Sequence, residues 1–163
     1  MQVTIRHIFV SPGHNFVGRF GQEPLDHEAR DLDEIECVAG KGLAGDRYFD
    51  HEENYKGQAT FFSWEVFQEM REAFQVANCP PSAMRRNILL EGIDLNALVG
   101  KTFTLQGVEF AGTEPCKPCS WMNTAVAEGA FDWLKGQGGL RCRITRGGIL
   151  SRGTCALEVA GET

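Results

Sequence analysis

Short apolar segments alternate with glycine-containing turns over the second half of the chain, and this pattern limits the fold more than any other feature. Six segments have the length and residue types of strands, and glycines lie between most of them. They are Asn87–Glu91, Thr102–Leu105, Val108–Gly112, Leu140–Thr145, Ile149–Ser151 and Cys155–Val159. Many short strands at this spacing are typical of a closed or nearly closed β-barrel. We therefore predict a mainly β (α+β) fold with a few short peripheral helices, in a single domain over residues 1–163.

The first half of the chain contains one further predicted strand and one predicted helix. Val3–Val10 alternates polar and apolar residues before an apolar end, which is typical of a strand. Ser63 has the side chain of a helix N-cap, and apolar residues follow it at the three- and four-residue spacing of a buried helix face. These residues are Trp64, Phe67, Met70 and Phe74. We expect the segment Cys79–Ser82, with its two prolines, to end this helix, and shorter helical pieces to lie at Trp121–Glu128 and Ala130–Leu134.

The charge of the chain excludes some classes of partner. The 163 residues include 16 basic and 22 acidic side chains, for a formal net charge of −6. An acidic chain lacks the basic surface of general nucleic-acid binding, and no stretch approaches the roughly 20 apolar residues of a membrane span. The first residues also lack the basic-then-apolar pattern of a signal peptide. We expect a cytoplasmic protein with no nucleic-acid or membrane partner.

The charge is unevenly distributed along the chain. Residues 1–80 carry 7 basic and 14 acidic side chains, whereas residues 81–163 carry 9 and 8. The second part includes Arg85, Arg86, Arg141, Arg143, Arg146 and Arg152. If residues 140–145 form a strand, Arg141 and Arg143 share one face of it. These arginines are either solvated ion-pair partners or the walls of a pocket for a small phosphorylated ligand.

Two cysteines three residues apart, Cys116 and Cys119, form the segment with the most chemistry. They are compatible with a zinc site, with a redox disulfide, with one reactive thiolate favoured by the adjacent Lys117, or with two buried structural thiols. A zinc site usually needs four ligands, and the chain offers no second pair at metal-ligand spacing. All four alternatives stay open from the residues alone, as does the question of whether Cys142 and Cys155 face the same site.

Seven short motifs, in order along nearly the whole chain, resemble the MOSC domain family, named for the C-terminal region of molybdenum cofactor sulfurases. No single motif is specific, but their order is. They lie at residues 8–16, 42–48, 57–62, 85–88, 92–100, 116–119 and 139–148. The chain is similar to the short, stand-alone bacterial members. It departs from the frequent closing Gly-Asp of the family, because Thr154 follows Gly153.

The resemblance implies a MOSC-type β-barrel in which a cysteine ligates the molybdenum of a molybdopterin cofactor or carries sulfur as a persulfide. The family's Pro-Cys matches Pro118-Cys119, so Cys119 is the expected metal ligand and catalytic residue, with Cys116 as its auxiliary. Arg47, Arg86, Asn87 and Arg141 match other family positions and are expected to bind the cofactor. Lys117, which lies beside the cysteines, and Arg146 are expected to join them because of their charge. Pyridoxal phosphate, which the family is associated with through fused enzymes, is not expected, because the chain has no desulfurase region.

Two functions follow from the resemblance. The first is a molybdenum-dependent oxidoreductase that reduces small N-hydroxylated or N-oxide substrates with electrons from a donor protein. The second is a non-catalytic carrier of sulfur or of the molybdenum cofactor, which delivers its cargo to an apo-molybdoenzyme. Both need an accessible thiolate in a cationic pocket.

Overall fold

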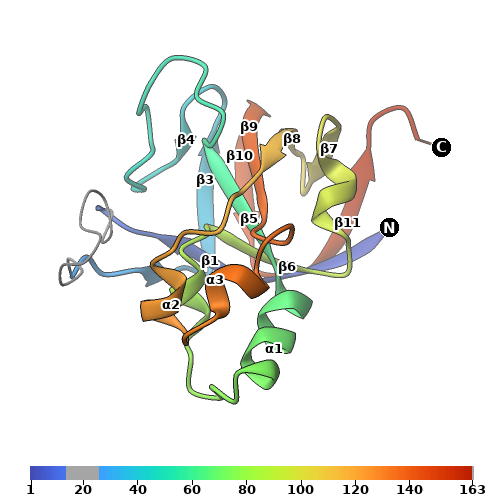
Figure 1. Ribbon diagram of the computed structural model, residues 1–163. Helices are drawn as coiled ribbons and strands as arrows, with labels where there is room; N and C mark the ends of the chain where they lie inside the picture. Colours follow the sequence, from blue (N-terminus) through green and yellow to red (C-terminus); the bar gives the residue numbers. More distant parts are fainter. Residues whose placement is uncertain (14–25, 163) are drawn as a thin grey trace.

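The computed structural model describes residues 1–13 and 26–162, and its elements are shown in Figure 1. In chain order, with η for a 3-10 helix, they are β1 (Gln2–Val10), β2 (Arg30–Asp31), β3 (Glu34–Val38), β4 (Gly42–Leu43), β5 (Ala59–Ser63), α1 (Trp64–Ala73), η1 (Pro81–Met84), β6 (Ile88–Glu91), η2 (Leu95–Leu98), β7 (Thr102–Leu105), β8 (Val108–Pro115), α2 (Met122–Ala125), α3 (Ala130–Trp133), β9 (Leu140–Arg146), β10 (Gly148–Ser151) and β11 (Gly153–Val159). The end of the first family-like motif, residues 14–16, lies outside the described residues. Among the described helices, none has the length and apolarity needed to span a membrane.

Strands from both halves of the chain form a closed barrel. The order around the described barrel is β11-β7-β8-β9-β5-β6-β1, and antiparallel pairing of β11 with β1 closes it. β5 and β6 pair in parallel, and β2 extends the sheet beyond the far end of β1. The mainly β barrel predicted from the glycine-punctuated segments is confirmed.

Apolar side chains fill the barrel interior, and along β7, β8 and β9 buried residues alternate with less buried ones. Phe61, Phe103 and Phe110 meet at its centre, with ring centroids 5.2 to 5.7 Å apart. All three rings are fully buried. Aromatic pairs at such distances add to the free energy gained by burying their area. This rigid interior holds the strand ends that carry the site.

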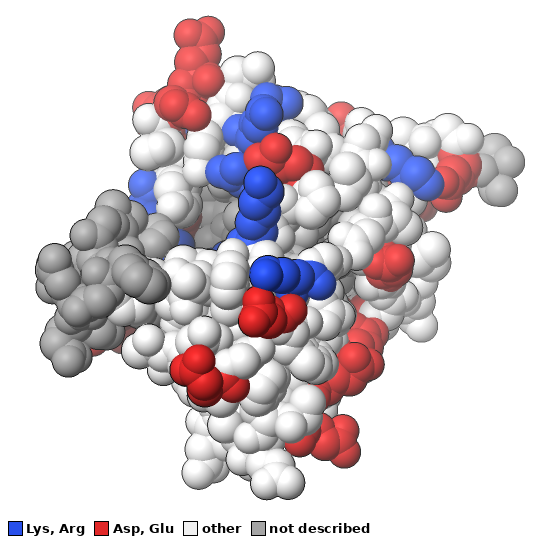
Figure 2. Space-filling view, viewed as in Figure 1, with Lys and Arg blue, Asp and Glu red and all other residues white. Residues whose placement is uncertain are grey.

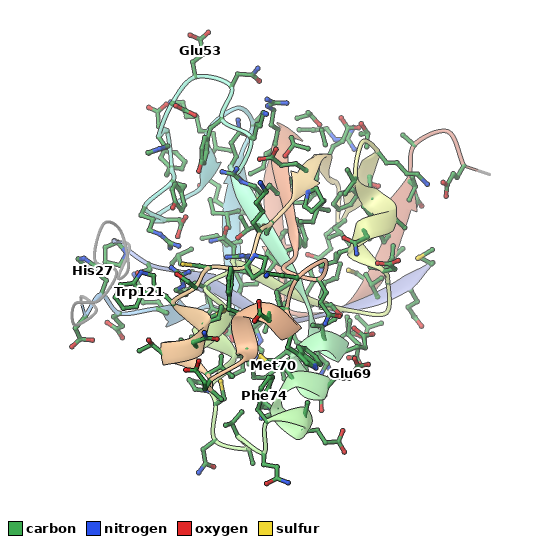
Figure 3. The ribbon with its side chains drawn as sticks, viewed as in Figure 1. His27, Glu53, Glu69, Met70, Phe74 and Trp121 are labelled. Atoms are coloured by element: carbon green, nitrogen blue, oxygen red, sulfur yellow. The ribbon has the colours of Figure 1, made fainter. Side chains whose placement is uncertain are left out.

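A helical layer covers one side of the barrel. α1 begins after Ser63, whose hydroxyl accepts a hydrogen bond from the Val66 amide at 3.2 Å, so the predicted cap is confirmed. Figure 3 shows Met70 and Phe74 on the side of α1 that faces α2 and α3, where they share one apolar cluster with those helices. The helix ends at Ala73, earlier than the expected Cys79–Ser82 stop, and Gln75 takes a left-handed conformation at φ 54°.

A small separate sheet and a long loop complete the fold. β10, β3 and β4 pair in that order, with Ile35 and Cys37 buried and the glutamates of β3 exposed. The 15 residues 44–58 that link β4 to β5 contain no described helix or strand and form the long loop at the top of Figure 1. Glu53 stands at the outer tip of this loop in Figure 3. We call residues 44–58 the β4–β5 loop.

Candidate functional site

A pocket of about 530 Å³ lies where the β4–β5 loop meets the end of β8 and the start of β9. Its lining residues are Arg47, Tyr48, Tyr55, Gly57, Thr60, Arg85, Arg86, Asn87, Glu114, Pro115, Cys116, Lys117 and Arg141. Five of these residues are cationic and one is acidic. Figure 2 shows lysine and arginine side chains in a row across this face of an otherwise acidic chain. We call this cavity the basic pocket.

Arg85 and Arg86 enter the basic pocket from the turn after η1. Arg85 ends η1 in a left-handed conformation at φ 55°, which turns the chain sharply into β6. Burial lowers the pKa of the Arg85 guanidinium, the neighbouring Arg86 lowers it further, and the Cys119 thiol opposes this change. The two adjacent arginines therefore concentrate positive charge on one wall.

Arg86 also organises the cysteine segment. Its Nε donates to the carbonyl oxygen of Gly138 at 3.0 Å, and an Nη donates to the carbonyl oxygen of Lys117 at 3.3 Å. The second of these carbonyls lies between the two thiols in sequence. A single guanidinium thus joins the cysteine segment to the glycines that precede β9.

The two thiols of the segment have different surroundings. Cys116 is 6% exposed and lines the basic pocket, whereas Cys119 is half-buried, is absent from the lining residues and lies beside Arg85. Burial raises the pKa of the Cys116 thiol, while Arg86 and Arg141 oppose the rise. Each thiol is therefore next to a different arginine of the Arg85–Arg86 pair.

Glycines allow the cysteine segment to lie close to the barrel. A β-carbon on Gly138 would lie 2.3 Å from the carbonyl oxygen of Cys116, and one on Gly139 would lie 2.2 Å from that of Phe61. Gly139 also has a φ of 109°, a conformation that L side chains rarely adopt. Its carbonyl accepts the Cys116 amide at 2.8 Å. Larger residues at either position would displace the backbone that positions the thiols.

Arg141 forms the opposite wall of the basic pocket. Its Nη1 is 2.7 Å from a carboxylate oxygen of Glu114, and its Nη2 donates to the Tyr55 hydroxyl at 2.8 Å. The hydrogen bond from Arg141 is the main reason that the pKa of Glu114 is lowered, whereas burial raises the pKa of Tyr55. Arg141 and Arg143 share one face of β9, as predicted, and Arg143 donates to the carbonyl oxygen of Asn54 at 3.1 Å.

The aromatic side of the pocket was not predicted from the sequence. Tyr48 and Tyr55 stack with ring centroids 5.5 Å apart, and His51 packs edge-on against both. Arg47 lies over the Tyr48 ring at 4.8 Å, and Arg141 lies over the Tyr55 ring at 5.3 Å. One signal for this cluster was available, because the only two tyrosines of the chain both lie in the β4–β5 loop.

Arg47 is anchored at its base by a buried carboxylate. Asp46 is 6% exposed, accepts the Ser11 and Tyr48 amides at 3.1 and 3.3 Å, and lies 3.5 Å from an Arg47 Nη. The Arg47 Nε is buried and makes no hydrogen bond with the described residues. The β4–β5 loop thus places in the basic pocket the Arg47 guanidinium, whose Nε has no hydrogen-bond acceptor among the described residues.

Not all of the residues expected to bind the cofactor meet in the pocket. Arg47, Arg86, Asn87, Lys117 and Arg141 line it. Arg146 does not, because it lies at the other end of β9, where its Nε donates to the carbonyl oxygen of Gly107 at 3.0 Å. Five residues along a strand span roughly 17 Å, too far for Arg141 and Arg146 to share one small ligand.

The other cysteines differ in their relation to the site. Cys142 is fully buried, and burial raises its pKa well above the ordinary value, with a smaller effect from the nearby Cys116. Cys155 lies on β11 beside Gln106, away from the basic pocket. Within residues 1–13 and 26–162, no cluster of three or more His, Cys, Asp or Glu side chains is arranged to hold a metal ion.

Comparisons with solved structures agree with the fold of the chain. The structure is similar to that of YuaD from Bacillus subtilis, with a TM-score of 0.75, 18% identity, and 98% of this chain and 96% of that chain covered. YiiM from Escherichia coli gives a TM-score of 0.68 at 15% identity, covering 100% of this chain and 71% of that chain. YiiM from Geobacillus stearothermophilus gives a TM-score of 0.68 at 14% identity, covering 97% of this chain and 75% of that chain. At such identities the likeness concerns the fold, and no curated protein matches the sequence.

The sequence also matches a family model. The match is to the MOSC domain and runs over residues 45–154. This range begins in the β4–β5 loop and ends in β11, so it contains all of the described residues that line the basic pocket. Because the match covers most of the chain and the barrel agrees with it, the chain belongs to the MOSC domain family.

Proposed function

We propose that the basic pocket binds the molybdenum cofactor and that the protein reduces small N-hydroxylated or N-oxide substrates at a cysteine-ligated molybdenum. One observation carries the proposal: five cationic side chains and a cysteine thiol line the same pocket. Molybdopterin has a phosphate at one end and a metal bound by sulfur at the other. Guanidinium groups suit the phosphate, and a thiolate suits the metal.

The donor set of the pocket fits these two ends. Arg47 has a buried Nε without a hydrogen bond to the described residues, so this atom can donate to an anionic oxygen without first losing a partner. Arg86, Arg141 and Lys117 add charge around the same volume. The stacked Tyr48 and Tyr55 rings offer a flat wall for a planar ring system. Among the described residues that line the pocket, Glu114 is the only acid, and it is paired with Arg141.

The roles of the residues follow from their positions. Cys119, which matches the family's Pro-Cys, supplies the thiolate ligand from beside Arg85, a residue of the pocket wall, and Cys116 is the thiol that lines the pocket itself. Arg47, Arg86, Arg141 and Lys117 bind and orient the phosphate. Asn87 shapes the wall without using its amide, which is already hydrogen-bonded inside the protein. When bound, the metal supplies two-electron transfer to the substrate, with electrons from a donor protein.

Metal content tests the proposal. The protein is purified from cells that make the cofactor, and molybdenum per chain is measured for the wild type and for Cys119→Ala, Cys116→Ala and Cys79→Ala. We expect metal in the wild type and in Cys79→Ala, whose thiol lies outside the pocket, and loss of metal in Cys119→Ala. Absence of metal from every sample, or unchanged metal in Cys119→Ala, would contradict the proposal.

A carrier is the second candidate function, and the pair of thiols favours it. In this case Cys119 holds a persulfide, or the pocket holds the cofactor, for delivery to an apo-molybdoenzyme, with no turnover. Intact-protein mass spectrometry would show one added sulfur that dithiothreitol removes. Turnover of an N-hydroxylated substrate by purified protein with an electron donor would exclude a carrier without activity.

A further inference from the structure

A second cavity, of about 280 Å³, adjoins the basic pocket. Its lining residues are Pro115, Cys116, Lys117, Pro118, Phe131, Lys135 and Gly136. Three of these, Pro115, Cys116 and Lys117, also line the basic pocket, so the two cavities meet at this short stretch of chain. We call the second cavity the side groove.

The side groove differs from the basic pocket in the chemistry of its walls. Pro115, Pro118 and Phe131 give it apolar walls, whereas five cationic side chains line the basic pocket. Small-molecule sites combine apolar walls with a few polar groups, and their volumes begin at roughly 300 Å³. At about 280 Å³ the side groove therefore suits a ligand the size of one substituted aromatic ring.

The two sides of the side groove are each held by backbone hydrogen bonds. On the side of the cysteines, the Cys116 amide donates to the carbonyl oxygen of Gly139 at 2.8 Å. On the side of α3, the Lys135 amide donates to the carbonyl oxygen of Asp132 at 3.3 Å. The groove is thus formed before a ligand arrives, which limits the cost of ordering it on binding.

Lys135 gives the side groove a positive charge. Its Nζ lies 5.0 Å from the centroid of the Phe131 ring and 2.7 Å from a carboxylate oxygen of Asp132. The Lys135 and Asp132 side chains are 61% and 77% exposed, and a pair this exposed contributes little to stability. Because an ammonium group has three hydrogens, Lys135 retains donors for an anion while Asp132 holds one of them. Among the described residues that line the groove, none is acidic.

We propose that the side groove binds the ring of an aromatic N-hydroxylated or N-oxide substrate, and that Lys135 binds an anionic substituent on this ring. The inference rests on the proposed function and adds the class of substrate, a single aromatic ring that carries an acid group. Because the cofactor is proposed to fill the basic pocket, the substrate needs adjoining space. The side groove supplies it, next to the shared wall of Pro115, Cys116 and Lys117.

Binding to cofactor-free protein tests the side groove without any activity. Protein made in cells without cofactor synthesis is titrated with three N-oxides, and the shifts of its assigned backbone amide resonances are followed by NMR. We expect saturable shifts of the Phe131, Lys135 and Gly136 amides. Pyridine-3-carboxylate N-oxide should bind about threefold more tightly than pyridine N-oxide, because its carboxylate meets Lys135. Trimethylamine N-oxide, which has no ring, should bind about tenfold more weakly than pyridine N-oxide.

Charge variants separate binding by Lys135 from a structural role. Lys135→Met keeps most of the aliphatic stem, so it should raise the Kd of the carboxylate compound about threefold and leave that of pyridine N-oxide unchanged. Asp132→Asn should lower the Kd of the carboxylate compound, because it removes the carboxylate that competes for Lys135. Lys101→Met removes an exposed pair with Glu162 outside the groove, and this matched control should change neither value.

Phe131→Leu tests the ring wall. Leucine keeps an apolar side chain against the cluster under the helical layer, so the thermal unfolding midpoint serves to show that the variant is folded. The Kd values of both ring compounds should rise about threefold or more, whereas that of trimethylamine N-oxide should not change. On cofactor-loaded protein, Lys135→Met should raise KM for the carboxylate compound about threefold with kcat unchanged, the sign of lost substrate binding.

Two outcomes would overturn the inference. One is a set of shifts confined to the Tyr48 and Tyr55 amides, which would place the ring compounds in the basic pocket; this result needs no variant. The other is an equal Kd of the carboxylate compound for Lys135→Met and the wild type. Molybdenum content is measured separately, so a metal-binding protein whose side groove takes no ring compound would refute this inference and leave the proposed function standing.

Discussion

Asn87 accepts two hydrogen bonds from Thr60 through one amide oxygen, from the backbone amide and from the hydroxyl, each at 3.0 Å. Its Nδ2 donates to the carbonyl oxygen of Phe9 at 3.1 Å. One buried amide thus links β5, the start of β6 and β1. Asn87 was expected to bind the cofactor, but these contacts indicate that it shapes the pocket wall.

Asn87→Ala should therefore lower the free energy of unfolding by about 2–4 kcal/mol, because it leaves buried polar groups of Thr60 and Phe9 without partners. Urea denaturation measures the change. Asn96→Ala, which removes an exposed hydrogen bond to the carbonyl oxygen of Gly136, is the control and should cost about 0.5 kcal/mol or less. Loss of bound molybdenum by Asn87→Ala with unchanged stability would show that the amide serves the ligand instead.

Gly138→Ala should displace the cysteine segment. The new methyl group would lie 2.3 Å from the carbonyl oxygen of Cys116, and relieving this overlap should cost about 1–3 kcal/mol of stability. We expect a changed rate of iodoacetamide labelling at Cys119, measured by peptide mass spectrometry.

Gly136→Ala separates this effect from backbone strain. Gly136 has a φ of 83° with no atom within 4 Å of the added carbon, so its replacement costs stability without pushing on the segment. It should leave the labelling rate of Cys119 unchanged. Equal changes in the two variants would show that the close approach of Gly138 does not position the thiol.

The Arg141–Glu114 pair should make the free energy of unfolding decrease as the pH is lowered through the acidic range. Arg141 lowers the pKa of Glu114 in the folded chain, so the stabilisation is present above the ordinary glutamate pKa and is lost as the pH falls through the lowered value. Carbon-13 NMR of the Glu114 carboxyl should give a titration below the usual range. Arg141→Met should return it toward the usual range, whereas Arg143→Met, which leaves the pair intact, should not.

Cys37 should make stability fall at alkaline pH. Burial raises its pKa from 9.0 to about 12 in the folded protein. The contribution of Cys37 to the free energy of unfolding is complete below the pKa of its thiol in the unfolded chain, near 9. Above that pH it decreases by about 1.4 kcal/mol per pH unit, because the thiol loses its proton in the unfolded chain but keeps it in the folded protein. Urea midpoints between pH 8 and 11 should fall less steeply in Cys37→Ala than in the wild type. Parallel curves would mean that the Cys37 thiol ionises as readily in the folded protein.

Local features were predictable from the sequence, and features made by distant contacts were not. The start of α1 was predicted because Ser63 caps it through a residue three positions away. Arg141 and Arg143 were placed on one face because strand geometry alone sets this relation. The predicted end of α1 was wrong, because the chain turns into a left-handed conformation at Gln75 and the helix stops before the prolines.

The site shows the same division. The cysteine pair and the arginines were visible as residue types, but their meeting depends on the pairing of β8 with β9 and on the turn after η1. Arg146 was predicted to lie with Arg141 because of its charge, but the two residues lie near opposite ends of β9. The Tyr48–Tyr55 stack arises within an irregular loop, where no periodicity exists to reveal it.

The antiparallel pairing of β1 with β11 has a consequence for folding. Gln2 lies opposite Ala156, so the seam of the barrel joins two segments separated by nearly the whole chain. Until β11 has been synthesised, the edge of β1 that β11 will cover presents free backbone amides and carbonyls, which are prone to pair with other chains. We expect the nascent chain to need protection at β1, and the barrel to close late and slowly because its seam has the longest loop to close.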